Sequence, residues 1–255
     1  MYCRLKNMNI EIIRNQLLDK GRELRAKPRA PIQFTKNQAA DEFLNNIETF
    51  PHAYVLGCVV DRQMPSERAW MIPFKIAEAI GGRDFRAFQG ISRSGIHQLM
   101  NEPTPLHRYA DIMADNLFQA IQIIGEKYNG LASNIWADSP SSSEVVYRFL
   151  EFPGIGQKIA TMAANILARE FKVPFADYYS IDISVDVHVR RVFGRLGLTP
   201  DNADNNQIIF RARSLSPEFP GLLDNPCFEI GKQWCKPEAP LCFQCYMAKI
   251  CPSAK

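Results

Sequence analysis

Four cysteines near the C-terminus restrict how the last part of this chain can fold. They stand in the segment CKPEAPLCFQCYMAKIC, at Cys235, Cys242, Cys245 and Cys251 of a 255-residue sequence. Bunched cysteines in a chain of this size suggest metal ligands rather than disulfides. The uneven spacing and the lack of a histidine in the segment favour a [4Fe–4S] cluster, although spacing alone leaves a zinc site open.

Composition places the rest of the chain among ordinary globular proteins. Apolar residues make up 46% and charged residues 22%, and no apolar run approaches the roughly 20 residues that span a bilayer. The N-terminus lacks the apolar region of a secretory signal, so we expect an intracellular protein without a membrane-bound part. The first 36 residues carry nine Lys/Arg and three Asp/Glu in a chain of net charge +3. This basic arm suits a polyanionic partner or, equally well, a solvated helix.

Helical spacing of apolar residues dominates the sequence and predicts an all-α fold of about ten helices. The first pattern places Ile10, Ile13, Leu17, Leu18 and Leu24 near one face, and similar patterns cover 40–50, 109–130, 141–152, 157–170 and 184–198. Breaks at 25–34, which is rich in Pro and Arg, and at 171–182 predict two domains. One would comprise residues 36–170, and the other residues 1–35 together with 171–255.

The segment FPGIGQKIA (152–160) lies between two expected helices and is typical of a helix-hairpin-helix turn. Gly154 and Gly156 permit a tight turn, Ile155 can plug it from inside, and main-chain amides at the start of the next helix can bind a phosphate. Lys158 follows at the helix N-terminus, where a neutral amine could form a Schiff base. A plain helix–helix turn with a solvated lysine is the competing interpretation.

The segment SVDVHVRRV (184–192) predicts a helix that begins at or near Asp186. Asp186 is expected to cap this helix, or to present a carboxylate that stabilises a developing positive charge. Asp182 is a rival carboxylate four positions earlier. Arg190 could reach a phosphate or remain solvated, and His188 is expected to support the structure.

Together, FPGIGQK, VDVH and Cys-x6-Cys-x2-Cys-x5-Cys resemble, in the same order, the signature of the endonuclease III-like branch of the helix-hairpin-helix (HhH-GPD) DNA glycosylase superfamily. The resemblance covers about residues 36–252. It implies a six-helix barrel domain with the helix-hairpin-helix at about 141–170. It also implies a smaller helical domain with a [4Fe–4S] cluster at 235–251, and a cleft between the two for DNA. The implied protein is a monomer that associates with double-stranded DNA containing a damaged base or an abasic site.

The same resemblance implies a base-excision-repair DNA glycosylase with AP lyase activity, acting on an oxidised pyrimidine. Lys158 would attack C1′ of a flipped-out nucleotide and form a Schiff base, and β-elimination would then nick the strand. Asp186 would assist departure of the base. Gly154, Ile155 and Gly156 would hold the DNA backbone through their main-chain amides.

Further DNA contacts follow from weaker matches. Gln63, in VLGCVVDRQMPSERAW, resembles the glutamine that fills the gap left by the flipped base, although it could simply precede a helix. The LHRY stretch is the candidate for a wedge into the opposite strand, with Tyr109 slightly preferred to Leu106. Arg190 and Lys236 are the remaining candidate DNA contacts.

Departures from the family pattern leave other functions open. Lys158 and Asp186 are separated by 27 residues, more than in the family pattern, and the longer segment contains Tyr178 and Tyr179. The same scaffold could excise an oxidised purine or a deaminated or mismatched base. A non-enzymatic DNA-binding module with a structural metal is the alternative from a different class, and in it Lys158 would contact phosphate only.

Overall fold

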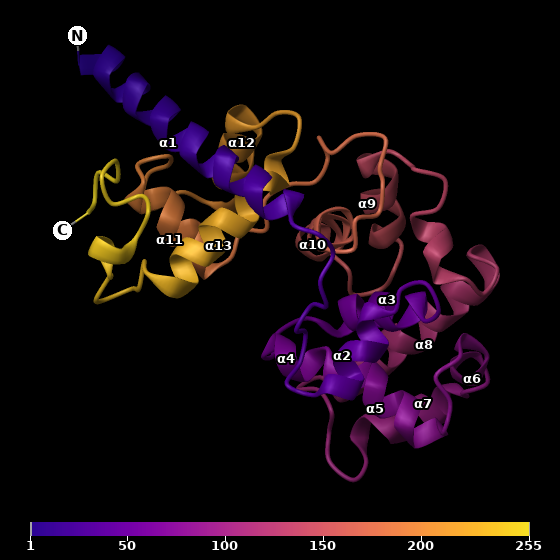
Figure 1. The fold of residues 1–255 in the computed structure, drawn as a ribbon. Helices are drawn as coiled ribbons and strands as arrows, with labels where there is room; N and C mark the ends of the chain where they lie inside the picture. Colours follow the sequence, from indigo (N-terminus) through magenta and orange to yellow (C-terminus); the bar gives the residue numbers. More distant parts are fainter. Residues whose placement is uncertain (1, 255) are drawn as a thin grey trace. The chain divides into compact units, whose positions relative to one another are not determined.

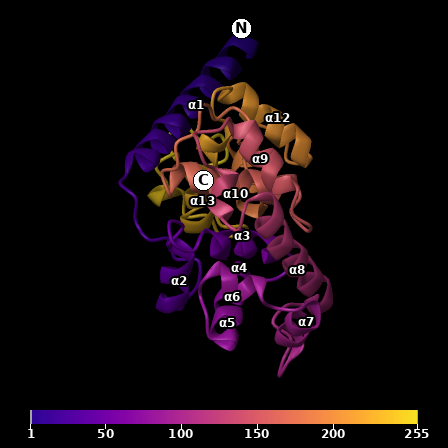
Figure 2. The same cartoon turned by 90° about the vertical axis from the view of Figure 1, so that its right-hand side faces the viewer.

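The computed structural model of the protein describes residues 2–254, with side chains described from Asn9 onward. The regular structure in this range consists of helices alone, which confirms the predicted all-α class. No helix in the described range has both the length and the apolar character needed to cross a bilayer. Two compact units are formed (Figures 1 and 2). Unit 1 holds the chain up to Pro28, Ser141–Ser143 and everything from Ala164 onward, and unit 2 holds Arg29–Pro140 and Glu144–Ala163.

Unit 2 is organised around one fully buried helix. Every residue of α3 (Pro51–Val60) is buried, and Pro51 stands in the first turn, where the N–H that proline lacks would have had no intrahelical partner. Gly57 allows the ring of Trp70 to lie against this helix, since a β-carbon there would come within 2.4 Å of the ring. The other elements of unit 2 are α2 (Gln38–Asn45), α4 (Ser66–Ala69), α5 (Met71–Ile80), α6 (Phe85–Gln89), α7 (Arg93–Asn101), α8 (Ala110–Lys127), η1 (Ala132–Ile135) and most of α9 (Ser142–Leu150). Helices α2, α5 and α8 pack on α3, and α7 packs on α8.

Unit 1 brings the two ends of the chain together. The N-terminal helix α1 (Tyr2–Ala26) packs on η2 (Pro220–Leu223) and α13 (Asp224–Gln233), and α13 also packs on α11 (Val187–Arg195). Ile13, Leu17 and Leu18 are buried on α1, as their spacing predicts. Gly21 lets α1 lie close against η2, because a β-carbon there would lie 2.5 Å from the carbonyl oxygen of Leu222. The remaining elements are α12 (Asn205–Leu215) and η3 (Cys242–Gln244).

The units divide at different points from the predicted limits of 36–170. The Pro- and Arg-rich segment after Pro28 is held on unit 2, since the side chain of Asn45 exchanges two hydrogen bonds with the backbone of Ile32, at 2.7 and 2.8 Å. At the other limit, α10 (Gln157–Arg169) is one helix shared by both units. Its second half belongs to unit 1, where Asn165 Nδ2 donates to the carbonyl of Gly221 at 3.1 Å.

The longer segment before Asp186 packs within unit 1. Tyr178 stacks on Phe219 with ring centroids 5.0 Å apart, and the guanidinium of Arg25 lies 4.2 Å from the Tyr178 ring centroid. Lys172 Nζ donates to the carbonyl of Arg25 at 2.6 Å. The segment therefore fastens the end of α1 to the turn before η2, while Tyr179 remains exposed.

Candidate functional site

The turn between α9 and α10 has the features of a hairpin plugged from inside. Ile155 is buried, and its N–H donates to the carbonyl of Phe152 at 3.0 Å, so this amide is used within the turn. Gly154 has a φ of +85°, a conformation that favours glycine, and a β-carbon there would lie 2.6 Å from Asn116 Nδ2 and displace it. A β-carbon on Gly156 would meet no atom within 4 Å. Of the three residues predicted to contact the DNA backbone, Gly156 is therefore the one with open space beside its α-carbon.

Lys158 stands in the first turn of α10 and is exposed. The first N–H groups of a helix have no partners within the helix and attract anions. The Thr161 hydroxyl fixes the backbone of this turn by donating to the carbonyls of Gln157 and Lys158, at 3.0 and 3.2 Å. Lys158 thus stands at a helix start whose free N–H groups favour an anion.

Gln63 and Tyr109, two predicted DNA contacts, are connected within unit 2 by a residue that the sequence analysis did not single out. The ring of His107 is buried, and its Nε2 lies 2.9 Å from the carbonyl oxygen of Arg62. The Tyr109 N–H donates to His107 Nδ1, also at 2.9 Å. Arg62 Nη1 in turn lies 3.4 Å from the carbonyl oxygen of Gly154 in the hairpin. The Gln63 loop, the Tyr109 loop and the hairpin are therefore linked.

Asp186 caps α11 in unit 1, as the sequence predicts. Its Oδ1 accepts the N–H groups of His188 and Val189, each at 2.8 Å. The rival carboxylate of Asp182 is buried and is bound by Arg213 through both oxygens, at 2.7 and 2.8 Å. Asp182 is thus committed to an ion pair, whereas Asp186 is half-buried at a helix start.

Asp224, at the start of α13, is a second carboxyl of unit 1 that the sequence analysis missed. Burial raises the pKa of Asp224 to about 6; the positive charge of Arg169 opposes the rise, and the carboxylate of Asp186 adds to it. Asn165 Nδ2 donates to Asp224 Oδ2 at 3.3 Å. The charges of Asp186 and Asp224 therefore act on each other, and nothing in the local sequence around Asp224 signals this.

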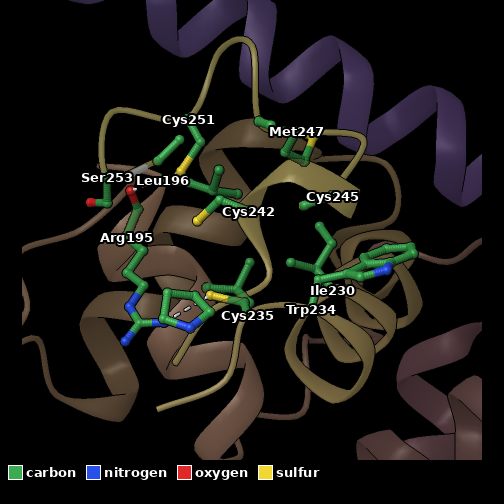
Figure 3. Close-up of a pocket in the computed structure, with 14 residues that line it drawn as sticks. Arg195, Leu196, Ile230, Trp234, Cys235, Cys242, Cys245, Met247, Cys251 and Ser253 are labelled. Atoms are coloured by element: carbon green, nitrogen blue, oxygen red, sulfur yellow. Dashed lines mark hydrogen bonds between the residues drawn. The ribbon is translucent and has the colours of Figure 1, made fainter. Parts of the chain in front are cut away.

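The four C-terminal cysteines line one pocket of unit 1 (Figure 3). Its other walls are mainly apolar side chains, among them Val192, Leu196, Ile230, Trp234 and Met247. Burial raises the pKa of the Cys245 and Cys251 thiols, and the neighbouring cysteines raise them further. No three His, Cys, Asp or Glu side chains in the described part of the chain lie close enough together to hold one metal ion.

Arginines of α11 hold the cysteine segment in place. Arg191 Nε donates to the carbonyl of Cys235 at 2.6 Å, and Arg195 donates to the carbonyls of Lys236 and Pro237, each at 2.6 Å. Arg195 Nη1 also lies 3.3 Å from Cys235 Sγ, the contact drawn in Figure 3.

The two remaining predicted DNA contacts have partners inside unit 1. The guanidinium of Arg190 bonds to the carbonyl of Ala203 and to the side chain of Asn205. Lys236 Nζ bonds to the carbonyl of Lys232. Both side chains are therefore engaged within the protein.

Comparison with known proteins agrees with this architecture. No family model matches the chain. Endonuclease III of Thermotoga maritima is 25% identical over 210 residues, which cover 81% of this chain and 85% of that protein. Endonuclease III of Synechocystis is 30% identical over 147 residues, 56% of each chain. The chain is thus similar to endonuclease III over most of its length.

Solved structures place the chain in the HhH-GPD glycosylase fold. A trapped endonuclease III–DNA covalent intermediate aligns with a TM-score of 0.54 at 19% identity, over 84% of this chain and 93% of that one. A thermostable thymine-DNA glycosylase aligns with a TM-score of 0.61 at 15% identity, over 98% of both chains. The predicted fold class is therefore confirmed, and the relatives support the predicted family.

Proposed function

We propose that the protein is a base-excision-repair DNA glycosylase with AP lyase activity, acting as a monomer on an oxidised pyrimidine in duplex DNA. The observation that carries the proposal is the placement of Lys158, an exposed amine in the first turn of α10, directly after a plugged hairpin. The open face of Gly156 supports close approach of a DNA backbone to this helix start.

In the proposed reaction, the damaged nucleotide leaves the base stack, and Lys158 Nζ in its neutral form attacks C1′ of the sugar. The C1′–N bond breaks, its electron pair leaves with the base, and the base takes up a proton. The lysine nitrogen gives up one proton, the C1′–O4′ bond breaks as the sugar ring opens, O4′ takes up a proton, and C1′ and the nitrogen form a protonated imine. Loss of a proton from C2′ then expels the 3′ phosphate by β-elimination. The carboxylate of Asp186, oriented by its two capping bonds, stabilises the positive charge on the sugar.

The four cysteines would hold a [4Fe–4S] cluster. Zinc sites usually pair two short knuckles held apart, whereas this segment has one short Cys-x2-Cys pair, uneven spacing and no histidine. A cluster takes one thiolate at each corner, which suits four cysteines in this arrangement. Its contribution would be structural, because it would close the segment after Cys235 upon α11 and α13. The bond-breaking residues proposed above lie elsewhere in the chain.

Borohydride trapping tests this function. We expect the protein to form a covalent complex with duplex DNA that carries one abasic site, and Lys158→Gln to lose that complex entirely. Lys158→Arg is the matched variant, since it keeps the positive charge for phosphate but cannot form an imine. Binding of abasic duplex by Lys158→Arg without trapping supports the proposal. Undiminished trapping with both variants excludes Lys158 as the nucleophile, and no trapping with the unaltered protein favours the non-enzymatic module.

A mismatched or deaminated base is the second candidate substrate. The structure that aligns over 98% of this chain is described as a thymine-DNA glycosylase, although a match at this identity supports the fold alone. Duplexes that each contain one oxidised pyrimidine, one oxidised purine or one G·T mismatch separate the candidates. Faster excision from the mismatch than from the oxidised pyrimidine would replace the first candidate with the second.

A further inference from the structure

The hydrogen bonds of His107 define the state of its buried ring. The ring is 2% exposed, and Nδ1 accepts the N–H of Tyr109. A ring nitrogen that accepts a hydrogen bond carries no proton, so the proton of the neutral ring is on Nε2. Nε2 therefore donates to the carbonyl of Arg62 at 2.9 Å. Both ring nitrogens are engaged, each with the backbone of a different loop.

The carbonyl that His107 binds belongs to the peptide bond that leads into Gln63. Gln63 has a φ of +53°, in the left-handed region that a residue with a side chain adopts at a cost. Such backbone conformations persist where surrounding contacts enforce them, and they cluster at functional sites. Here the preceding peptide is fixed through the Arg62 carbonyl by His107. The side chain of Arg62 adds the contact with the Gly154 carbonyl of the hairpin.

We propose that His107 is a positioning residue, which sets the left-handed backbone of Gln63 and the backbone of Tyr109 in a fixed register so that both side chains reach DNA together. The inference rests on the proposed function and on the predicted contacts of Gln63 and Tyr109 with duplex DNA. His107 itself is buried and touches no DNA. Its effect passes through two backbone groups, the Arg62 carbonyl and the Tyr109 amide.

Two amide side chains can separate the two hydrogen bonds. A glutamine at position 107 extends far enough for its Nε2 to replace the ring Nε2 at the Arg62 carbonyl. A shorter asparagine can offer its Oδ1 where the ring Nδ1 meets the Tyr109 N–H. His107→Phe keeps a ring of similar size and removes both hydrogen bonds. His107→Phe therefore removes both hydrogen bonds, His107→Gln removes only the one to Tyr109, and His107→Asn removes only the one to Arg62.

The test is equilibrium binding to a duplex with an uncleavable tetrahydrofuran abasic analogue, compared with the same duplex undamaged. We expect His107→Phe to weaken binding to the analogue about tenfold, and to change binding to undamaged duplex less than about twofold, because phosphate contacts dominate non-specific binding. His107→Gln should recover more of the affinity than His107→Asn, since it restores the bond next to Gln63. A folded His107→Phe that binds the analogue as the unaltered protein does would overturn the inference.

Stability measurements keep the inference testable even if His107→Phe unfolds easily. Glycine adopts a positive φ freely, so Gln63→Gly removes the cost of the left-handed conformation that His107 is proposed to enforce. The drop in Tm caused by His107→Asn or His107→Phe, which both lose the bond to the Arg62 carbonyl, should then be smaller in combination with Gln63→Gly. Equal drops in both backgrounds would show that His107 does not enforce the Gln63 backbone. If the unaltered protein binds both duplexes equally, the proposed function itself is wrong. That result differs from unchanged analogue binding by His107→Phe and from equal Tm drops in both backgrounds, which contradict only the role of His107.

Discussion

The two compact units differ in how they satisfy their buried polar groups. In unit 2, the buried helix α3 is surrounded by other helices, and the buried rings of His52 and His107 both bond to backbone carbonyls. In unit 1, six buried side-chain atoms have no hydrogen-bond partner among the described residues: Asn165 Oδ1, Arg169 Nη1, Ser184 Oγ, Thr199 Oγ1, Glu229 Oε2 and Tyr246 OH. Each such group costs about 1–3 kcal/mol.

This difference suggests that the units are stabilised in different ways. Unit 2 has an apolar core, in which whole helices pack around the buried helix α3. Unit 1 is assembled from separated stretches of the chain, and after α13 it contains little regular structure beyond η3. It therefore depends more on side-chain clamps, such as those of Arg191 and Arg195, and on the proposed metal centre. Loss of these supports should affect unit 1 first.

The largest expected effect comes from removing a cluster ligand. Cys242→Ala should destabilise unit 1 by about 5 kcal/mol or more, because metal binding free energy becomes folding free energy. Cys58→Ala, at a buried cysteine of unit 2, should cost only about 1 kcal/mol, since it deletes one small buried group. Limited proteolysis with mapped cleavage sites measures the difference. If the C-terminal segment resists proteolysis equally in both variants, unit 1 does not depend on the metal centre more than unit 2 does.

A smaller effect is expected from pH in unit 2. Burial lowers the pKa of His52 from 6.5 to about 4. The unfolded chain therefore binds a proton before the folded chain does, and stability falls as pH drops from about 6.5 to 4, by about 3 kcal/mol. Denaturant unfolding of the protein and of His52→Leu across this range measures the effect. The difference between their unfolding free energies should shrink as the pH falls, and a pH-independent difference contradicts the assignment.

The smallest effect is expected in unit 1, and it has the opposite sign. The pKa of Asp224 is raised by burial from 3.8 to about 6, so the folded chain binds the proton first and stability is lost as pH rises from about 4 to 6. Asp224→Asn should raise the unfolding free energy at pH 7 by up to about 3 kcal/mol, and by almost nothing below pH 4. The same denaturant titrations measure it. A destabilised Asp224→Asn at pH 7 would show that the ionised carboxylate is held by favourable contacts.

Features encoded in short stretches of sequence were predicted well. The Asp186 cap depends on two amides within three residues of the carboxylate, and the four cysteines lie close together in the chain. The buried face of α1 follows from helical spacing. These predictions succeed because the interacting groups are neighbours along the chain, where geometry is set by the local backbone.

Features that depend on distant contacts were missed. His107 bonds to a carbonyl 45 positions away, and Asp224 is buried against Asn165, so neither environment leaves a local pattern. The compact units begin and end a few residues from the predicted limits of 36–170, because Pro and Arg residues indicate where a helix stops and not which core the next segment joins. For Arg190, the sequence left two interpretations, and only the fold reveals its partners Ala203 and Asn205.

The path of the chain through the two units has a consequence for dissecting the protein. The backbone passes between units four times, and two of these passages fall inside helices, at Ser143–Glu144 in α9 and at Ala163–Ala164 in α10. A gene cut at either point would split a helix, and a cut at Pro28 or Pro140 would leave one unit without part of its chain. Neither unit can therefore be expressed as one continuous piece of the chain. A destabilising substitution in α10 should lower the stability of both units.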